Sequence, residues 1–216
     1  MADRKTAPQD TVESQPYNTG LDARDITFDR LTVVGNQAKH AVARRANPGD
    51  LAIGESAEDV DATFIEKPNA LRFYILDIHA NYACGFDGPQ GQWEEGDPSM
   101  PPDARRQYNL TLFAPEYSSD LPVIYTASAS AAGIVRKGLN KRYALASISG
   151  DPVELAFEMT TDFRPHTKGP YPVPVFKLAK SVPSEVEAAK RVRSMVFAEV
   201  NDKQITAGSD SESPGF

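Results

Sequence analysis

The strongest apolar run of the chain extends from Ala70 to Tyr82 and predicts one long β-strand. Apolar residues occupy both alternating rows in its first part, which indicates that both faces are buried there. One row then becomes polar, which suits a strand that leaves the core at the mouth of a barrel. The apolar rows are Leu71, Phe73, Ile75 and Tyr74, Leu76, Ile78, and the polar row is Asp77, His79, Asn81.

Shorter segments with alternating patterns predict further strands. Pro172 and Pro174 would remove two amide donors from the last of them, so it is expected at an edge of the sheet. The residues between the third and fourth of them, Pro115 to Asp120, would form a hairpin loop. These strands are Ile26–Val34, a short one at Leu51–Ile53, Tyr108–Ala114, Leu121–Ala127, Val153–Phe163 and Tyr171–Lys180.

Two segments have the spacing of helices. The first covers residues 129–145, with Ile134, Val135, Leu139 and Tyr143 as its apolar stripe. The second opens at a capping box formed by Ser184 and Glu187 and continues to about Ala198. The strands come in sequential runs and do not alternate with helices, so we expect a mainly β fold: an antiparallel sheet or small barrel with helices attached.

Length and composition narrow the classes of protein. The chain has 216 residues, a net charge of −7, one cysteine and three histidines. A single cysteine excludes an intrachain disulfide framework and any CxxC zinc site. No apolar run is long enough for a membrane span and no signal peptide is visible, so a cytoplasmic protein is expected. We divide the chain into a disordered arm at 1–24, one domain at 25–200 and a flexible acidic tail at 201–216.

The sequence offers little for catalysis. Nucleotide-binding loops, zinc-protease motifs and nucleophile elbows are all missing. Cys84 is expected to be a small core residue, and His79 beside Asp77 to be a hydrogen-bonded histidine at the barrel mouth. A nuclease would need carboxylates such as Asp77 and Asp162 around a magnesium ion. We therefore expect neither enzyme activity nor a cofactor.

Charge is distributed unevenly along the chain. Residues 133–180 hold eight bases and four acids, although the whole chain is acidic. Basic residues there and in neighbouring segments are interleaved with aromatic residues, and this combination is typical of surfaces that bind single-stranded nucleic acid. The candidate DNA-binding residues are Arg72, Tyr74, Trp93, Arg105, Arg106, Tyr108, Arg136, Lys137, Lys141, Arg142, Arg164, Lys168 and Tyr171. The alternative for the helix at 129–145 is a plain solvated basic face.

The last eight residues read Ser-Asp-Ser-Glu-Ser-Pro-Gly-Phe, with Asp210, Glu212 and Phe216 as the acids and the aromatic end. This tail resembles those of single-stranded-DNA-binding proteins of bacteria and of T7-like phages, which close with an acidic segment and Phe. The order of parts is also similar to the phage group, and the segment from Lys168 to Phe176 followed by a helix adds to the likeness. The resemblance implies an OB-like antiparallel barrel with one internal and one C-terminal helix. It also implies a tail that recruits replication proteins and shields the DNA groove.

Two functions from different classes remain open. The first is a sequence-independent single-stranded-DNA-binding protein in phage replication or recombination, whose tail binds a polymerase, helicase or primase in the host cytoplasm. The second is a virion structural or assembly protein with a β-sandwich or barrel, which the acidic charge and the proline-rich connections also fit. An assembly protein would form large, defined oligomers without DNA. Whether the chain forms a homodimer is left open.

Overall fold

The computed structural model describes residues 28–36, 38, 41, 45–55, 61–65, 70–85, 88–89 and 91–207. At 129–130 and 198–207 only the backbone is described. The arm predicted at 1–24 and the tail residues Asp210, Glu212 and Phe216 lie outside these ranges. Within them, every helix is too short or too polar to cross a lipid bilayer.

The described residues form one eight-stranded sheet in the order β3-β2-β1-β6-β5-β4-β7-β8. The β1–β6 pair is parallel and every other neighbouring pair is antiparallel. The mainly β prediction is therefore confirmed, with one strand, β3, that the sequence did not indicate. The strands are β1 Arg30–Val33, β2 Leu51–Gly54, β3 Thr63–Phe64, β4 Leu71–Ala83, β5 Arg105–Phe113, β6 Val123–Ala127, β7 Ala156–Arg164 and β8 Tyr171–Leu178.

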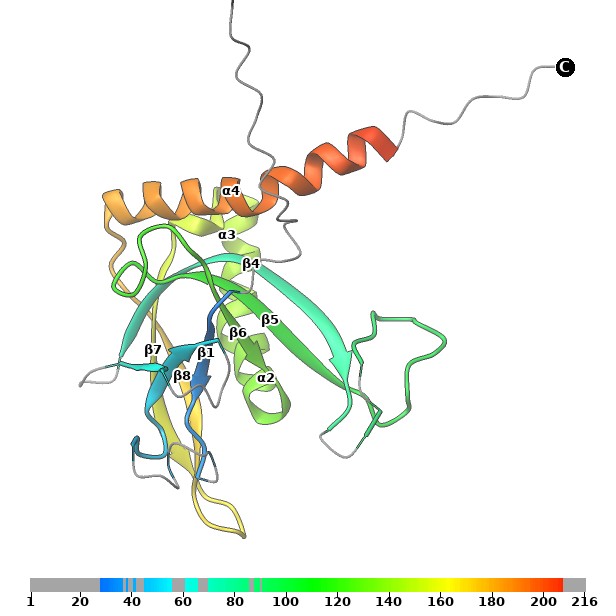
Figure 1. The fold of residues 1–216 in the computed structure, drawn as a ribbon, viewed down its shortest axis with the longest axis vertical. Helices are drawn as coiled ribbons and strands as arrows, with labels where there is room; N and C mark the ends of the chain where they lie inside the picture. Colours follow the sequence, from blue (N-terminus) through cyan, green and yellow to red (C-terminus); the bar gives the residue numbers. More distant parts are fainter. Residues whose placement is uncertain are drawn as a thin grey trace, which may run out of the picture.

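The sheet curls on itself but stays open (Figure 1). The tip of the β7–β8 hairpin returns to the loop between β1 and β2. Here the Asn36 side-chain amide donates to the carbonyl of Pro170 at 2.7 Å, and the Thr161 hydroxyl donates to the carbonyl of Gly49 at 2.6 Å. The result is a half-barrel whose two ends are held together by loop contacts.

Strand β8 is the last strand of the sheet, and its two prolines affect the free edge. The Ala179 amide donates to the Ala156 carbonyl, so in the continuous β7–β8 register Pro172 and Pro174 fall in non-hydrogen-bonded pairs. Their ring nitrogens therefore face away from β7, and the free edge lacks two donors that another strand could use. The prediction of an edge strand is confirmed.

Three consecutive helical segments lie between β6 and β7: α2 (Ala129–Val135), a π-helical turn η2 (Arg136–Asn140) and α3 (Lys141–Ser149). They extend the predicted helix by four residues. Val135 and Leu139 are buried against the main core inside the curl, as the apolar stripe predicted. This stretch fills the open side of the half-barrel from within (Figure 1).

Helix α4 (Pro183–Ala207) covers the outer face of the sheet, where Val186, Ala189 and Val192 pack on Tyr74 and Leu76 (Figure 1). The helix begins at Pro183, so Ser184 lies inside the first turn and the predicted capping box is wrong. It also continues through residues 201–207, which the sequence assigned to the tail.

Strand β4 is buried on both faces in its first part, as predicted, but its alternation is interrupted. The pairing with β5 shifts between Ile75 and Asp77, so Leu76 and Asp77 both lie on the outer side. Ile78 consequently joins the inner core rather than the row of Tyr74 and Leu76. The sequence had placed Ile78 on the wrong face.

Strand β7 also differs from its prediction. Residues Pro152–Glu154 form a 3₁₀ turn, η3, and the strand starts at Ala156. Phe157 and Met159 are buried as expected, whereas Phe163 is exposed near the tip of the hairpin. Ala156 is buried too, because α4 covers the face that the sequence indicated as solvated.

Candidate nucleic-acid interface

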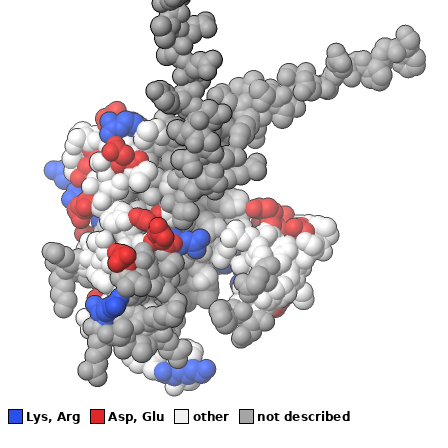
Figure 2. Space-filling view, viewed as in Figure 1, with Lys and Arg blue, Asp and Glu red and all other residues white. Residues whose placement is uncertain are grey.

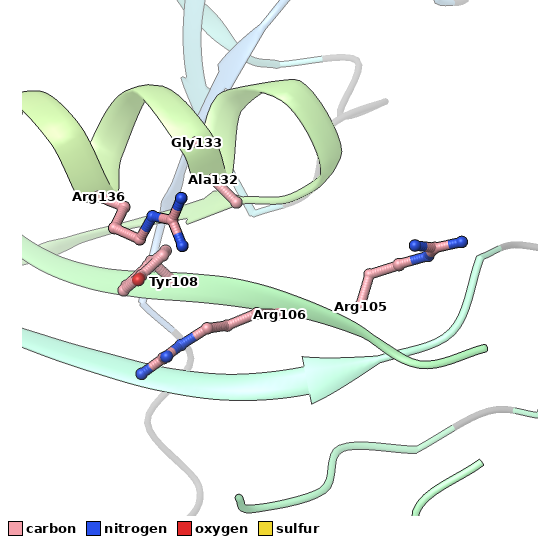
Figure 3. Close-up of a pocket in the computed structure, with 6 residues that line it drawn as sticks. All are labelled: Arg105, Arg106, Tyr108, Ala132, Gly133 and Arg136. Carbon is pink, nitrogen blue, oxygen red and sulfur yellow. The ribbon is translucent and has the colours of Figure 1, made fainter. Parts of the chain in front are cut away.

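Four of the predicted binding residues meet around one cavity of about 450 Å³, between the start of β5 and α2. Arg105, Arg106 and Tyr108 come from β5, and Arg136 comes from the turn that follows α2 (Figure 3). Ala132 and Gly133 complete the lining. A Cβ added at Gly133 would meet no atom within 4 Å, so this side of the cavity is open space.

Strand geometry explains why Arg106 and Tyr108 share the cavity. Residues two apart on a strand point to the same face. Tyr108 is only 2 % exposed and packs in the main core. Arg106, two residues earlier on the same strand, is exposed. The Arg106 guanidinium carbon lies 5.6 Å from the centre of the Tyr108 ring, a cation–π distance.

The cavity has an excess of positive charge. Arg106 has one acidic partner, Glu95, at 3.8 Å between nitrogen and oxygen, and both side chains are largely exposed. Neither Arg105 nor Arg136 forms an ion pair with a residue that the structure describes. Two guanidinium groups therefore remain available to an anionic ligand, and planar guanidinium groups match phosphate oxygens in geometry.

The strand register adds two aromatic rings to the same face. Tyr82 lies opposite Arg106 in the β4–β5 pair, and on its other side it exchanges two backbone hydrogen bonds with Trp93, at 2.8 and 2.9 Å. Residues directly opposite each other point to the same side of a sheet. Trp93, Tyr82 and Arg106 therefore follow one another on one surface, which we call the aromatic platform, and the Tyr108 ring is buried beside Arg106 without a face on which a base could stack.

Tyr82 is a residue that sequence reasoning missed. It lies eight positions after Tyr74 on the same strand, so simple alternation would place both rings on one face. The shift in the β4–β5 pairing between Ile75 and Asp77 places the two rings on opposite faces of the sheet instead. Tyr74 consequently lies under α4, and Tyr82 lies beside the cavity.

The opposite face of the same strands is lined by uncharged polar groups. A groove of about 540 Å³ has Gln92, Gln107, Asn109 and Thr126 among its lining residues, with Arg30 at the adjoining strand. Asn81 is 1 % exposed and donates to the Gln92 carboxamide at 2.6 Å, while its own carbonyl oxygen has no hydrogen-bond partner among the described residues. This groove offers hydrogen-bonding groups but little charge.

The remaining predicted cations fall into two groups. Lys137, Lys141 and Arg142 are exposed on the helical stretch that continues from Arg136. Arg164 and Lys168 are exposed at the β7–β8 hairpin, where the Tyr171 ring meets His166 edge-on at 5.8 Å between centres. Figure 2 shows blue atoms at the tip of this hairpin, and elsewhere on this face separate blue and red patches.

Arg72 and Tyr74 are committed to holding α4. The Tyr74 ring is fully buried, its hydroxyl donates to Glu185 at 2.8 Å, and it accepts from the Val182 amide at 3.1 Å. Burial raises the pKa of this hydroxyl above its ordinary value. Arg72 lies 3.3 Å from Glu116 and 3.7 Å from Glu185. Because Tyr74 has no exposed ring face on which a base could stack, we remove it from the interface.

The groups considered for catalysis are placed apart from one another. His79 is exposed and 3.0 Å from Glu94, rather than paired with Asp77. Cys84 is half-buried instead of core, and burial, followed by the neighbouring Asp103, raises the pKa of its thiol. Among the described residues, no cluster of His, Cys, Asp or Glu side chains could hold a metal ion.

No protein-family model, curated protein or solved structure matches the chain.

Proposed function

We propose that the protein binds single-stranded DNA without sequence preference, through the arginine-lined cavity and the aromatic platform beside it. The observation that carries the proposal is that Arg105, Arg106 and Arg136 line one cavity together with Tyr108, with Tyr82 and Trp93 beside Arg106. Binding of this kind combines cations that follow the phosphate backbone with ring faces on which bases stack. Arg106 of the cavity and Tyr82 of the platform occupy paired positions of β5 and β4.

The path of the chain supports an OB-like barrel as the scaffold. In this assignment β4, β5, β6, β7 and β8 are the five barrel strands, and α2 to α3 connect the third to the fourth. OB folds bind oligonucleotides on strands two and three and on the loops after strands one and four. Here these are β5 and β6, the segment at 84–104 that contains Trp93, and the hairpin loop that contains Lys168. Arg164, Lys168 and Tyr171 would then extend the path beyond the cavity.

The direct test measures how DNA affinity depends on salt. Each phosphate contact on a single strand contributes about 0.7 to the slope of log affinity against log salt concentration. Replacing Arg105→Gln and Arg136→Gln together should therefore reduce the slope by about 1.4, as measured by fluorescence anisotropy with a labelled oligo-dT of about 30 nucleotides.

The matched control is a double variant that removes two positive charges at positions away from the cavity. Lys180 and Arg191 are exposed on the side of the molecule that holds α4, and Lys180→Gln with Arg191→Gln should leave the slope unchanged. Equal losses in both double variants would show that binding follows overall charge, and the proposed site would be wrong.

The proposal includes the segment with Asp210, Glu212 and Phe216, which we assign to recruitment of replication proteins and to competition with DNA for the cationic surface. A chain ending at Ala207 should bind oligo-dT more tightly than the full chain at low salt. Unchanged affinity would remove the competing role of this segment.

A further inference from the structure

The stretch at 129–149 differs from the rest of the chain in charge. It contains four basic residues and no acidic one, in a protein of net charge −7. Arg136, Lys137, Lys141 and Arg142 are all exposed, and none forms an ion pair with another described residue. An acid-free helical surface in an acidic protein calls for an explanation beyond solubility.

The π-helical turn lies at the centre of these four residues. It covers Arg136–Asn140, between two ordinary α-helical segments. A π turn holds one residue more than an α turn, so residues five apart across it take the places that residues four apart take in an α-helix. Arg136 is therefore brought over Lys141, and Lys137 over Arg142.

An uninterrupted α-helix would separate the same pairs. At about 100° per residue, positions five apart diverge by about 140° around the axis. The four cations would then spread over about 240° around the helix axis instead of following one side of it. π turns are rare and are found often at functional sites, which agrees with a role for this one.

The aligned cations are continuous with the cavity because Arg136 belongs to both. We propose that Arg136, Lys137, Lys141 and Arg142 form a phosphate-binding strip, aligned by the π turn, along which a nucleic-acid strand continues from the cavity. The inference rests on the proposed function and deepens it. It states which way the strand leaves the site and which structural element sets that direction.

The test moves one charge around the helix without altering the composition. Exchanging Lys141 with Ser147 places this cation about 120° away from its position in the strip. Ser147 is exposed, so the helix keeps its buried contacts. The two variants are Lys141→Ser, which removes the charge, and Lys141→Ser with Ser147→Lys, which restores it at the new position.

Two probes separate the strip from the cavity. With an oligo-dT of about 30 nucleotides, both variants should lower the salt slope by about 0.7. With one of about 6 nucleotides, near the short end of OB-fold site sizes, both should bind like the unaltered protein because that probe occupies only the cavity and platform. Circular dichroism and thermal melting confirm that each variant remains folded.

The outcomes that overturn the inference differ from those that overturn the proposed function. A relocated variant that regains the original slope would show that the helix acts through overall charge, and the alignment by the π turn would then be irrelevant. A charge-removed variant with an unaltered slope would show that the strand takes another path, while binding of the short probe would keep the cavity. If the unaltered protein binds neither probe, both proposals fail.

Discussion

Removing the Tyr82 ring is the perturbation that isolates the aromatic platform. Tyr82→Leu keeps an apolar side chain of similar reach on β4 and leaves untouched the two backbone hydrogen bonds to Trp93, because both use main-chain atoms. Arg105, Arg106 and Arg136 also keep their positions around the cavity. The variant therefore removes a stacking surface and no charge.

The expected effect follows from the number of bases that lose a partner. One ring accommodates one base, and base–aromatic stacking contributes about 1–3 kcal/mol per base. The dissociation constant for oligo-dT should therefore increase about 5- to 140-fold. The salt slope should stay the same because the count of phosphate contacts does not change.

Anisotropy titrations of an oligo-dT of about 10 nucleotides, within the site size of one OB fold, measure both quantities. Tyr171→Leu is the matched variant: it makes the same substitution on the β7–β8 hairpin, where the proposed path continues beyond the cavity, so with this short probe it should weaken binding by less than about threefold. Two results would refute the reasoning: unchanged affinity in Tyr82→Leu, or a loss in Tyr171→Leu as large as that in Tyr82→Leu. The second would move the stacking site to the hairpin.

Three predictions concern the scaffold. Tyr74→Phe removes the hydrogen bonds to Glu185 and from the Val182 amide, so the free energy of unfolding should fall by about 2 kcal/mol and Tm by about 4–8 °C; a Tm within 1 °C of the original would contradict this. Desolvation raises the pKa of Asp151, but hydrogen bonds from Arg193 and from the Val153 amide, with the charge of Arg193, outweigh it and hold that pKa below its ordinary value. Because the folded pKa is the lower one, the stabilisation is complete above about pH 5 and is lost as pH falls through the folded value. Asp151→Asn should therefore cost about 1 kcal/mol at pH 7 in urea titrations, and this cost should shrink as the pH is lowered below about 4; a cost that does not change with pH would contradict this. Pro172→Thr with Pro174→Val should supply two amide donors to the free edge of β8 and raise self-association in sedimentation velocity, whereas a monomer as stable against association as the original would show that the prolines do not protect this edge.

The sequence predicted the parts of the fold that depend on local pattern. The first half of β4 carries apolar residues in both rows, and both faces are indeed buried, by the inner core and by α4. The prolines of β8 marked an edge because a missing amide is tolerated only where no partner strand needs it. These features require no knowledge of which elements meet.

The parts that could not be predicted depend on register and on distant contacts. The irregularity in β4 has no signature in the run Ile75-Leu76-Asp77, yet it decides that Tyr74 is buried and that Tyr82 lies beside the cavity. The pairing of Trp93 with Tyr82 joins a loop to a strand across a long connection. Arg105, Arg106, Tyr108 and Arg136 were chosen for composition alone, and only the packing of α2 against β5 brings them together.

The most direct test of the central claim uses the only tryptophan in the chain, Trp93, which lies on the platform. Its intrinsic fluorescence would be titrated with oligo-dT of about 30 nucleotides at low and at high salt, with anisotropy of a labelled oligonucleotide followed in parallel. The account predicts a saturable change in Trp93 fluorescence that coincides with the binding curve and weakens steeply as salt rises. Binding without any change in Trp93 fluorescence would place the DNA elsewhere, and no binding together with large, defined oligomers would favour the assembly protein.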